Sequence, residues 1–365
     1  SGTAPMVTGI LNTGAAGNTF DYNPNGAQAV KSNTYYRLTI SAGGTKTLAG
    51  AVTVNDLLTI SAGTLADGGF VLTAKDDILV NGAHTGAGSI ALSGGSAAHN
   101  LSGTGTLFNL NLNDTNGAVL GSNMTINGTL TLTDGLLTIG ANDLTLTTVG
   151  GTPGATKMIV ANGAGQVKRN FAIGASSFTF PIGDNTGSYS PASFTFTANA
   201  TAGLVGVRVV NAKHPANTAP DNYLNRYWKI TAPTLTTYTY SASFSYPVTD
   251  VTGTGESTFL AQRYNNGTAT WTTDMTSTTN TGTHTFITGS LTQVTGTLDN
   301  NDFTSYYNTD LYYWSKATGN WNGAAVWELS TTPVDPGVGL GSATAVVPTY
   351  NNNLAITIRS GNNVS

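Results

Sequence analysis

The stretch from Thr129 to Thr148, TLTLTDGLLTIGANDLTLTT, constrains the fold more than any other part of the chain. Its apolar residues come in pairs spaced by two, and Gly, Asn or Asp separates one pair from the next. Period-2 alternation is typical of strands with one buried face, and the separating residues are those that favour turns. A chain that turns after every short strand predicts the coils of a β-solenoid. The pairs are Leu130 and Leu132, Leu137 and Ile139, and Leu144 and Leu146.

The same pattern occurs earlier in the chain. Residues 36–74 align with residues 108–146 at a constant offset of 72, without a gap. Matched residues are apolar positions and turn glycines, such as Leu58 with Leu130 and Gly63 with Gly135. The match predicts an internal duplication within a β-solenoid, similar to a parallel β-helix, over residues 1–150. Chance similarity in a sequence rich in Thr, Leu and Gly is the alternative.

Composition narrows the range of functions. Only 9% of the residues are charged and the net charge is −4, so no basic surface is expected for nucleic acid. No apolar run is long enough to span a membrane as a helix, so we expect no membrane insertion. The chain has no cysteine, which fits an exported β-protein held together by packing and hydrogen bonds.

From about residue 165 the alternation lengthens and becomes rich in aromatic residues. Alternate positions of one stretch are apolar from Tyr238 to Tyr246, which predicts a single long strand with one buried face. Strands of this length joined by turns are typical of an antiparallel β-sandwich. We therefore predict a sandwich over residues 165–305, with Trp228 and Phe244 in its core.

Residues 310–365 contain a tryptophan-rich block. Trp314, Trp321 and Trp327 lie within a short stretch, and alternation resumes near the end of the sequence. This block predicts a cap and the first strands of a further solenoid module, in which the tryptophans form the cap core. Exposed tryptophans that bind glycans by stacking are the alternative. Because Ser1 is not a start methionine, we expect a segment of a longer chain whose strand at Leu354–Val364 pairs with another module or subunit.

Residue types that carry chemistry are few and scattered. The histidines have no metal-ligand spacing, so we expect them in turns or at the surface. The adjacent pair Asp76-Asp77 is expected in a turn, since neighbours on a strand point to opposite faces. Side-chain oxygens of Asp299, Asn301 and Asp302, with Asn300 between them, could converge in one turn on calcium, although a plain turn explains them too. We expect no catalytic residue and no cofactor other than this calcium. The histidines are His84, His99, His214 and His284.

Four pieces of the sequence carry a family resemblance. They are AQAVKSNTYYRLTISAGGTKTLAG (27–50), FTFPIGDNTGSYSPASFTF (178–196), NRYWKI (225–230) and GNWNGAAVWELSTTP with ITIRSGNNV (within 319–364). These pieces resemble giant cell-surface adhesin-like proteins of Bacteroidota, which combine β-solenoid and β-sandwich modules and are commonly exported by type IX secretion. The resemblance implies an extracellular or cell-surface location and an adhesive or filament-forming role.

Three functions remain open at this point. The first is a structural or adhesive segment of a large bacterial surface or filament protein, with neighbouring modules or subunits of the same protein as partners. The second is a carbohydrate-binding adhesin module, with surface glycans as partners. The third is a polysaccharide-degrading enzyme built on a β-helix. We expect the first, and no enzymatic activity.

Overall fold

The computed structural model describes residues 12–274, 276–293, 297–307, 312–321, 326–330, 338, 342–343 and 356–365. The fold is all-β, as predicted, with 50% of the residues in strands and 2% in helices. The chain divides into two compact units. The first comprises residues 1–170, 180–189 and 204–208, and the second comprises residues 171–179, 190–203 and 209–365.

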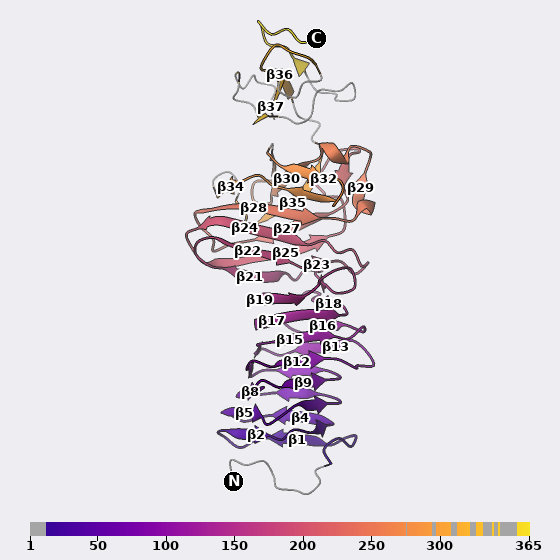
Figure 1. Ribbon diagram of the computed structural model, residues 1–365, viewed down its shortest axis with the longest axis vertical. Coiled ribbons are helices and arrows are strands. Elements are labelled where there is room, and N and C mark those ends of the chain that lie inside the picture. Colours follow the sequence, from indigo (N-terminus) through magenta and orange to yellow (C-terminus); the bar gives the residue numbers. More distant parts are fainter. Residues whose placement is uncertain are drawn as a thin grey trace. The chain divides into compact units, whose positions relative to one another are not determined.

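The first unit is a β-solenoid of about eight turns (Figure 1). One face is a nine-stranded parallel sheet to which each coil adds one short strand. Its strands, in order, are β1 (Thr19–Tyr22), β4 (Arg37–Ile40), β7 (Leu58–Ile60), β10 (Ile78–Val80), β13 (His99–Ser102), β16 (Ala118–Leu120), β18 (Leu137–Thr138), β20 (Ile159–Val160) and β23 (Ile182–Gly183).

Two further columns of parallel strands complete the coils. The second column contains β2 (Gln28–Val30), β5 (Thr45–Leu48), β8 (Thr64–Ala66), β11 (Ala83–Thr85), β14 (Thr106–Leu107), the first parts of β17 (Met124–Asp134) and β19 (Leu144–Gly151), and β21 (Val167–Phe171). The third contains β3 (Thr34–Tyr35), β6 (Val52–Val54), β9 (Val71–Ala74), β12 (Ser89–Leu92), β15 (Leu110–Asn113) and the later parts of β17 and β19.

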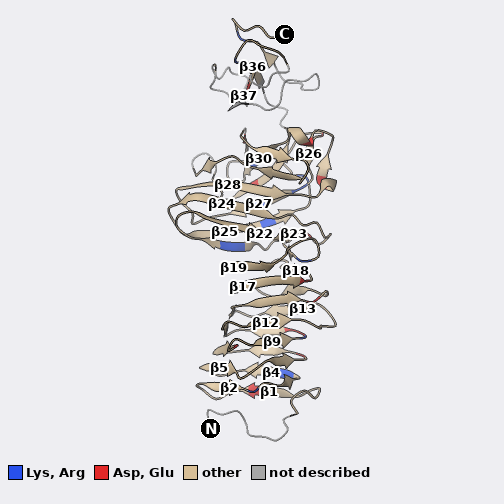
Figure 2. Cartoon of the chain, viewed as in Figure 1, with Lys and Arg blue, Asp and Glu red and all other residues tan. Residues whose placement is uncertain are grey.

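Alternation along each strand explains why the coils close. In β7 the side chains of Leu58 and Ile60 are fully buried, while Thr59 between them faces outward. Leu38, Leu58 and Ile78 are register partners on successive coils, so identical inward positions stack into a continuous apolar core. The charged residues of this unit are few (Figure 2), and some form ion pairs, such as Arg37 with Asp56.

Glycines allow the coils to turn closely against one another. Gly135 has a φ of +87°, and a Cβ atom there would lie 1.9 Å from the carbonyl oxygen of Asp114 on the preceding coil. Only glycine fits a left-handed position pressed against a neighbouring backbone. Gly105 is equally close to the backbone of Gly82, which makes the turn glycines a requirement of coil spacing.

The repeat that the structure contains is the single coil. Steps between register partners from Leu38 to Leu120 are 20, 20, 23 and 19 residues. The predicted duplication of 36–74 as 108–146 relates a buried position to another buried position, as for Leu38 and Leu110. These two residues, however, lie in β4 and β15, which belong to different faces. The offset of 72 therefore matches the inward pattern only after a shift by one face of the solenoid.

The second unit contains two antiparallel sheets. One is ordered β22 (Ser176–Phe180), β24 (Ala192–Asn199), β28 (Tyr238–Ser245), β33 (Thr285–Ile287) and β32 (Thr278–Asn280), and β34 (Leu291–Thr292) also pairs with β28. The other contains β26 (Tyr223–Leu224), β27 (Tyr227–Thr231), β29 (Val251–Thr252), β30 (Leu260–Asn265), β31 (Thr270–Thr273) and β35 (Asn301–Tyr306). The short 3₁₀ helices η1 (Val248–Asp250) and η2 (Glu256–Thr258) lie between β28 and β30.

The core of the second unit is aromatic, as the sequence predicts. Trp228 and Phe244 are fully buried, and their ring centroids lie 5.0 Å apart. Phe244 from one sheet also stacks on Phe303 from the other at 5.2 Å. The predicted one-sided strand from Tyr238 to Tyr246 is confirmed, because every alternate residue in it is buried. The two sheets therefore pack face to face as a sandwich.

The boundary predicted near residue 150 is too early. The pairs β18 with β20 and β20 with β23 continue the nine-stranded sheet to residue 183. Ile159 and Val160 are buried, although they lie between the predicted solenoid and the predicted sandwich. A coil needs only two inward residues on this face, so the turn-rich sequence conceals it. No helix among the described residues is long and apolar enough to cross a membrane.

Four short strands lie in the tryptophan-rich part of the second unit. They are β36 (Tyr312–Ser315), β37 (Trp327–Ser330), β38 (Ser342–Ala343) and β39 (Ile356–Thr357), in the order β38-β37-β36-β39. β39 pairs in parallel with β36, so part of the stretch Leu354–Val364 has a partner within the same chain. Leu354 itself and residues 310–311 at the start of this predicted module lie outside the described residues.

Candidate functional site

The side-chain oxygen atoms of the predicted calcium-binding turn do not converge on one point. Asn301 and Asp302 begin β35, and neighbouring residues of a strand point to opposite faces. Oδ1 of Asp299 accepts a hydrogen bond from the backbone N–H of Ala232 at 2.8 Å, while the Asp302 carboxylate turns toward Lys229. The geometry therefore does not support the calcium hypothesis. Within the described ranges, no three His, Cys, Asp or Glu side chains come together as a metal site.

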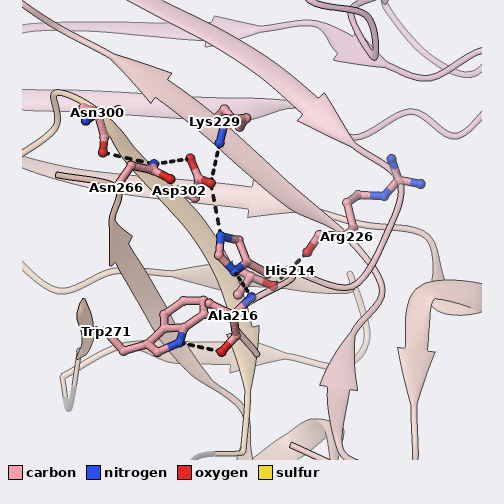
Figure 3. Close-up of polar contacts among 9 residues, drawn as sticks. His214, Ala216, Arg226, Lys229, Asn266, Trp271, Asn300 and Asp302 are labelled. Carbon is pink, nitrogen blue, oxygen red and sulfur yellow. Dashed lines mark hydrogen bonds and ion pairs between the residues drawn. The ribbon is translucent and has the colours of Figure 1, made fainter. Parts of the chain in front are cut away.

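Asp302 instead forms the centre of a buried polar cluster (Figure 3). Its carboxylate accepts hydrogen bonds from Nζ of Lys229 at 2.6 Å, from Nε2 of His214 at 3.1 Å and from Nδ2 of Asn266 at 2.9 Å. Burial alone would raise the pKa of Asp302, but hydrogen bonds from His214, Lys229 and Asn266 outweigh burial and lower this pKa. The carboxylate is therefore ionised, with its charge matched by Lys229.

His214 uses both ring nitrogens. Nε2 donates to Asp302, and Nδ1 accepts the backbone N–H of Ala216 at 3.2 Å (Figure 3). The carbonyl of Ala216 in turn accepts the indole N–H of Trp271 at 3.1 Å. The rings of Tyr227, Tyr264 and Trp271 all lie within 4.8 Å of the imidazole, centroid to centroid. A ring that is enclosed and bonded at both nitrogens has no free position for a general base, so His214 fastens its segment to the sheet.

His99 makes a second buried pair, in the solenoid. Its Nδ1 lies 2.8 Å from the carbonyl oxygen of Asp76, and its Nε2 lies 3.1 Å from Oδ2 of Asp114. The ring of His99 thus lies between a backbone carbonyl oxygen and a carboxylate oxygen that come from different parts of the chain. Burial raises the pKa of Asp114, but N–H groups of Asn116 and Gly95 and the charge of His99 lower it below its usual range. The pair is thus a cross-link between coils.

His84 makes a third buried pair, also in the solenoid. Nε2 of His84 lies 3.2 Å from Oδ2 of Asp67, and both side chains are almost fully buried. Burial lowers the pKa of His84, and Asp67 opposes this shift without cancelling it. Oδ1 of Asp67 is held by the backbone N–H groups of Gly69 and Gly88.

The prediction of surface or turn histidines is wrong for His84 and His99, which lie in β11 and β13 and are 2% and 0% exposed. His214 begins a turn, since its carbonyl oxygen accepts the backbone N–H of Asn217 at 2.9 Å, but its side chain is buried as well. Their carboxylate partners lie 15 to 88 residues away in the sequence, on other coils or strands. Only His284 is partly exposed, and its Nδ1 lies 2.8 Å from Glu256. Local spacing carries no signal for pairs that form only when distant strands meet.

Lys46 is a buried residue that the sequence does not single out. It occupies an inward position of β5, is fully buried, and donates from Nζ to four backbone carbonyl oxygens. These carbonyls belong to turns on two successive coils, so the ammonium group joins them. They are those of Pro24, Gly26, Ala42 and Gly43, at 2.6 to 3.3 Å.

The three predicted tryptophans have different environments. Trp327 is fully buried with Tyr313 and Val326, and Trp321 packs on it at 5.1 Å between ring centroids. The indole N–H of Trp327 donates to the carbonyl of Trp321 at 2.9 Å. Trp314 is partly buried, with the guanidinium of Arg359 5.6 Å from its ring centre. The cluster of Trp321 and Trp327 forms a small core, and the three rings do not form one shared exposed surface.

No protein-family model, curated protein or solved structure matches the chain. Its function must therefore be argued from its own side chains. The buried side chains of Lys46, His99 and Asp302 are joined to fixed partners. Of the adjacent carboxylates Asp76 and Asp77, Asp77 accepts the backbone N–H of Asn100 at 2.8 Å. Burial, followed by the neighbouring Asp77, raises the pKa of Asp76.

Proposed function

We propose that the chain is an extracellular structural and adhesive segment of a large bacterial surface or filament protein. Its β-modules provide a scaffold, and its contacts with neighbouring modules or subunits are made end to end. The observation that carries this proposal is the use of its chemically capable side chains as cross-links. The scaffold is proposed to act without catalysis.

The cross-links support a mechanical role. Lys46 joins turns of two coils, and the pair of His99 and Asp114 joins two more. Each contact replaces an inward apolar residue by a bonded polar group, which fixes the register between coils. A protein that must keep its coils aligned under load benefits from such fixed contacts.

The surface composition also supports a scaffold. Outward positions such as Thr59, Thr125 and Thr145 carry short uncharged side chains. Threonine suits a pleated, half-exposed surface and interacts little with mobile ions. Such a surface allows close contact with other uncharged surfaces without the cost of removing water from charges.

The end-to-end contact is proposed for the part of the chain around β39. Ile358 follows this strand directly, and its side chain is 47% exposed. An exposed apolar residue beside a short strand is a candidate for strand pairing with another module. This location makes a direct test possible.

Sedimentation velocity over a range of protein concentrations tests the proposal. The intact chain is expected to form species larger than a monomer as its concentration rises. Ile358→Lys should shift this association to higher concentration by about tenfold or more, because a charge at an apolar contact must lose its water.

Ile173→Lys is the matched control, since Ile173 is also an exposed isoleucine, 69% exposed, in the same unit. This control should associate as the intact chain does. An intact chain that stays monomeric at every concentration would contradict the proposal, as would an equal effect of both substitutions.

A further inference from the structure

A groove of about 550 Å³ runs along the solenoid where its second column of strands meets the preceding turns. We name it the coil groove and define it by Thr106, Thr125, Thr145, Lys168, Asn123 and Leu204, which all line it. All of these residues belong to the first unit. Its volume is within the range of sites that hold small molecules or short stretches of polymer.

The floor of the coil groove repeats once per coil. Thr106 is the register partner of Thr125, Thr125 of Thr145, and Thr145 of Lys168. All four side chains face outward from parallel strands, so they form a row with a spacing of about 4.8 Å. A row of polar groups at constant spacing suits a ligand that repeats at a similar length. The length of one sugar unit in an extended polysaccharide is close to this spacing.

The charges in the coil groove cancel. Nζ of Lys168 lies 2.6 Å from Oδ2 of Asp143, and both side chains are about one-third exposed. Ionised groups form strong hydrogen bonds with hydroxyl groups, and this pair presents both a donor and an acceptor. A groove without net charge offers no advantage to a polyanion such as nucleic acid.

Two further side chains add a fixed amide and an apolar surface to the coil groove. Asn123 is exposed, and its Oδ1 accepts the backbone N–H of Asp143 at 2.8 Å, so its amide is held in place. Leu204, in β25 (Gly203–Val210), is 38% exposed at the same groove. An apolar side chain beside fixed polar groups matches a sugar ring, which has C–H faces and a hydroxyl rim.

We propose that the coil groove binds an uncharged, unbranched polysaccharide that lies along the stacked coils, with about one sugar unit for each coil. The site covers four successive coils from Thr106 to Lys168. This activity goes beyond the scaffold role and does not depend on end-to-end association, so either can fail alone.

Methyl NMR of the intact chain tests the proposal. The probes are the tetrasaccharides of β-1,4-linked glucose, mannose and N-acetylglucosamine, each compared with its monosaccharide. At least one tetrasaccharide should bind saturably and shift the methyl signals of Leu204, and its monosaccharide should bind much more weakly. Raising the salt concentration should leave the affinity unchanged, because the groove has no net charge.

Two substitutions locate the binding. Thr125→Val keeps the shape but removes the hydroxyl, and should weaken binding by about three- to tenfold. Lys168→Met should weaken it by about tenfold or more, because a charged donor is lost. The matched control is Thr59→Val, the same exchange at an outward position of β7 on another face of the solenoid.

Thr59→Val should bind as the unmodified chain does. The proposal is overturned if none of the three tetrasaccharides binds saturably, or if Thr59→Val weakens binding as much as Thr125→Val. It is also overturned if a tetrasaccharide binds saturably while the methyl signals of Leu204 stay in place.

Discussion

The Lys46 ammonium lies inside the solenoid and donates only to backbone carbonyl oxygens. Its register partner on the next coil is Leu65, and that of Leu65 is His84. One inward column thus contains a lysine, a leucine and a histidine on successive coils. The alternation of a strand predicts that a residue faces inward, but the partners of a polar inward residue depend on the neighbouring coils.

Replacing Lys46 tests its role as a cross-link. Lys46→Met keeps the length of the side chain but leaves buried carbonyl groups without their donor. The free energy of unfolding should fall by about 2–3 kcal/mol in urea denaturation. Lys75→Met, at an exposed lysine of the same solenoid, should change it by about 0.5 kcal/mol or less. Equal effects at the two sites would show that the carbonyl contacts of Lys46 contribute little.

His84 gives the solenoid a pH dependence of defined sign. Burial lowers the pKa of His84 in the folded chain, whereas an unfolded histidine titrates near about 6.5. The unfolded state therefore takes up the proton first as the pH falls. The stability that neutral His84 contributes is complete above about pH 6.5 and is lost as the pH falls toward its folded pKa.

Unfolding free energies at about pH 7.5 and about pH 5.5 measure this contribution. His84→Gln should reduce the difference between the two values, because glutamine does not titrate. A full pH dependence that persists in His84→Gln would rule out this assignment.

At the scale of the element, the coil is the unit that the sequence describes well. Pairs of apolar residues separated by turn residues predict the short strands, and the burial of Leu130, Leu132, Leu144 and Leu146 confirms them. The coil length could not be predicted, because it varies from 19 to 23 residues over four successive steps. Because the turns differ in length, the sequence has no constant repeat length. The alignment at an offset of 72 therefore found the inward pattern but not the coil.

Leu132 tests the packing of one coil on the next. It is fully buried and stacks on its register partner Leu112 in β15. Leu132→Asp should lower the free energy of unfolding by about 3–5 kcal/mol, because it buries a charge without a partner. Thr131→Asp is the matched control on the outward face of the same strand, and its effect should be much smaller. A loss below about 1 kcal/mol for Leu132→Asp would contradict the inward position.

At the scale of the whole molecule, the sequence predicted the all-β class, the solenoid and the aromatic sandwich core. It could not predict how the chain is divided, because segments 180–189 and 204–208 belong with the solenoid although they lie within sandwich-like sequence. It also misplaced the polar residues. Asp302 was assigned to calcium, and its actual partners Lys229 and His214 lie 73 and 88 residues away in the chain. Residues of this kind meet only after the strands have paired.

We propose that the molecule acts through its modules and surfaces and associates end to end. Electron micrographs of the intact chain, taken at concentrations where sedimentation detects association, test this claim most directly. We predict linear arrays in which each particle joins the next at its ends, and shorter arrays for Ile358→Lys than for Ile173→Lys. Single particles at every concentration, or clusters joined side by side, would contradict the claim.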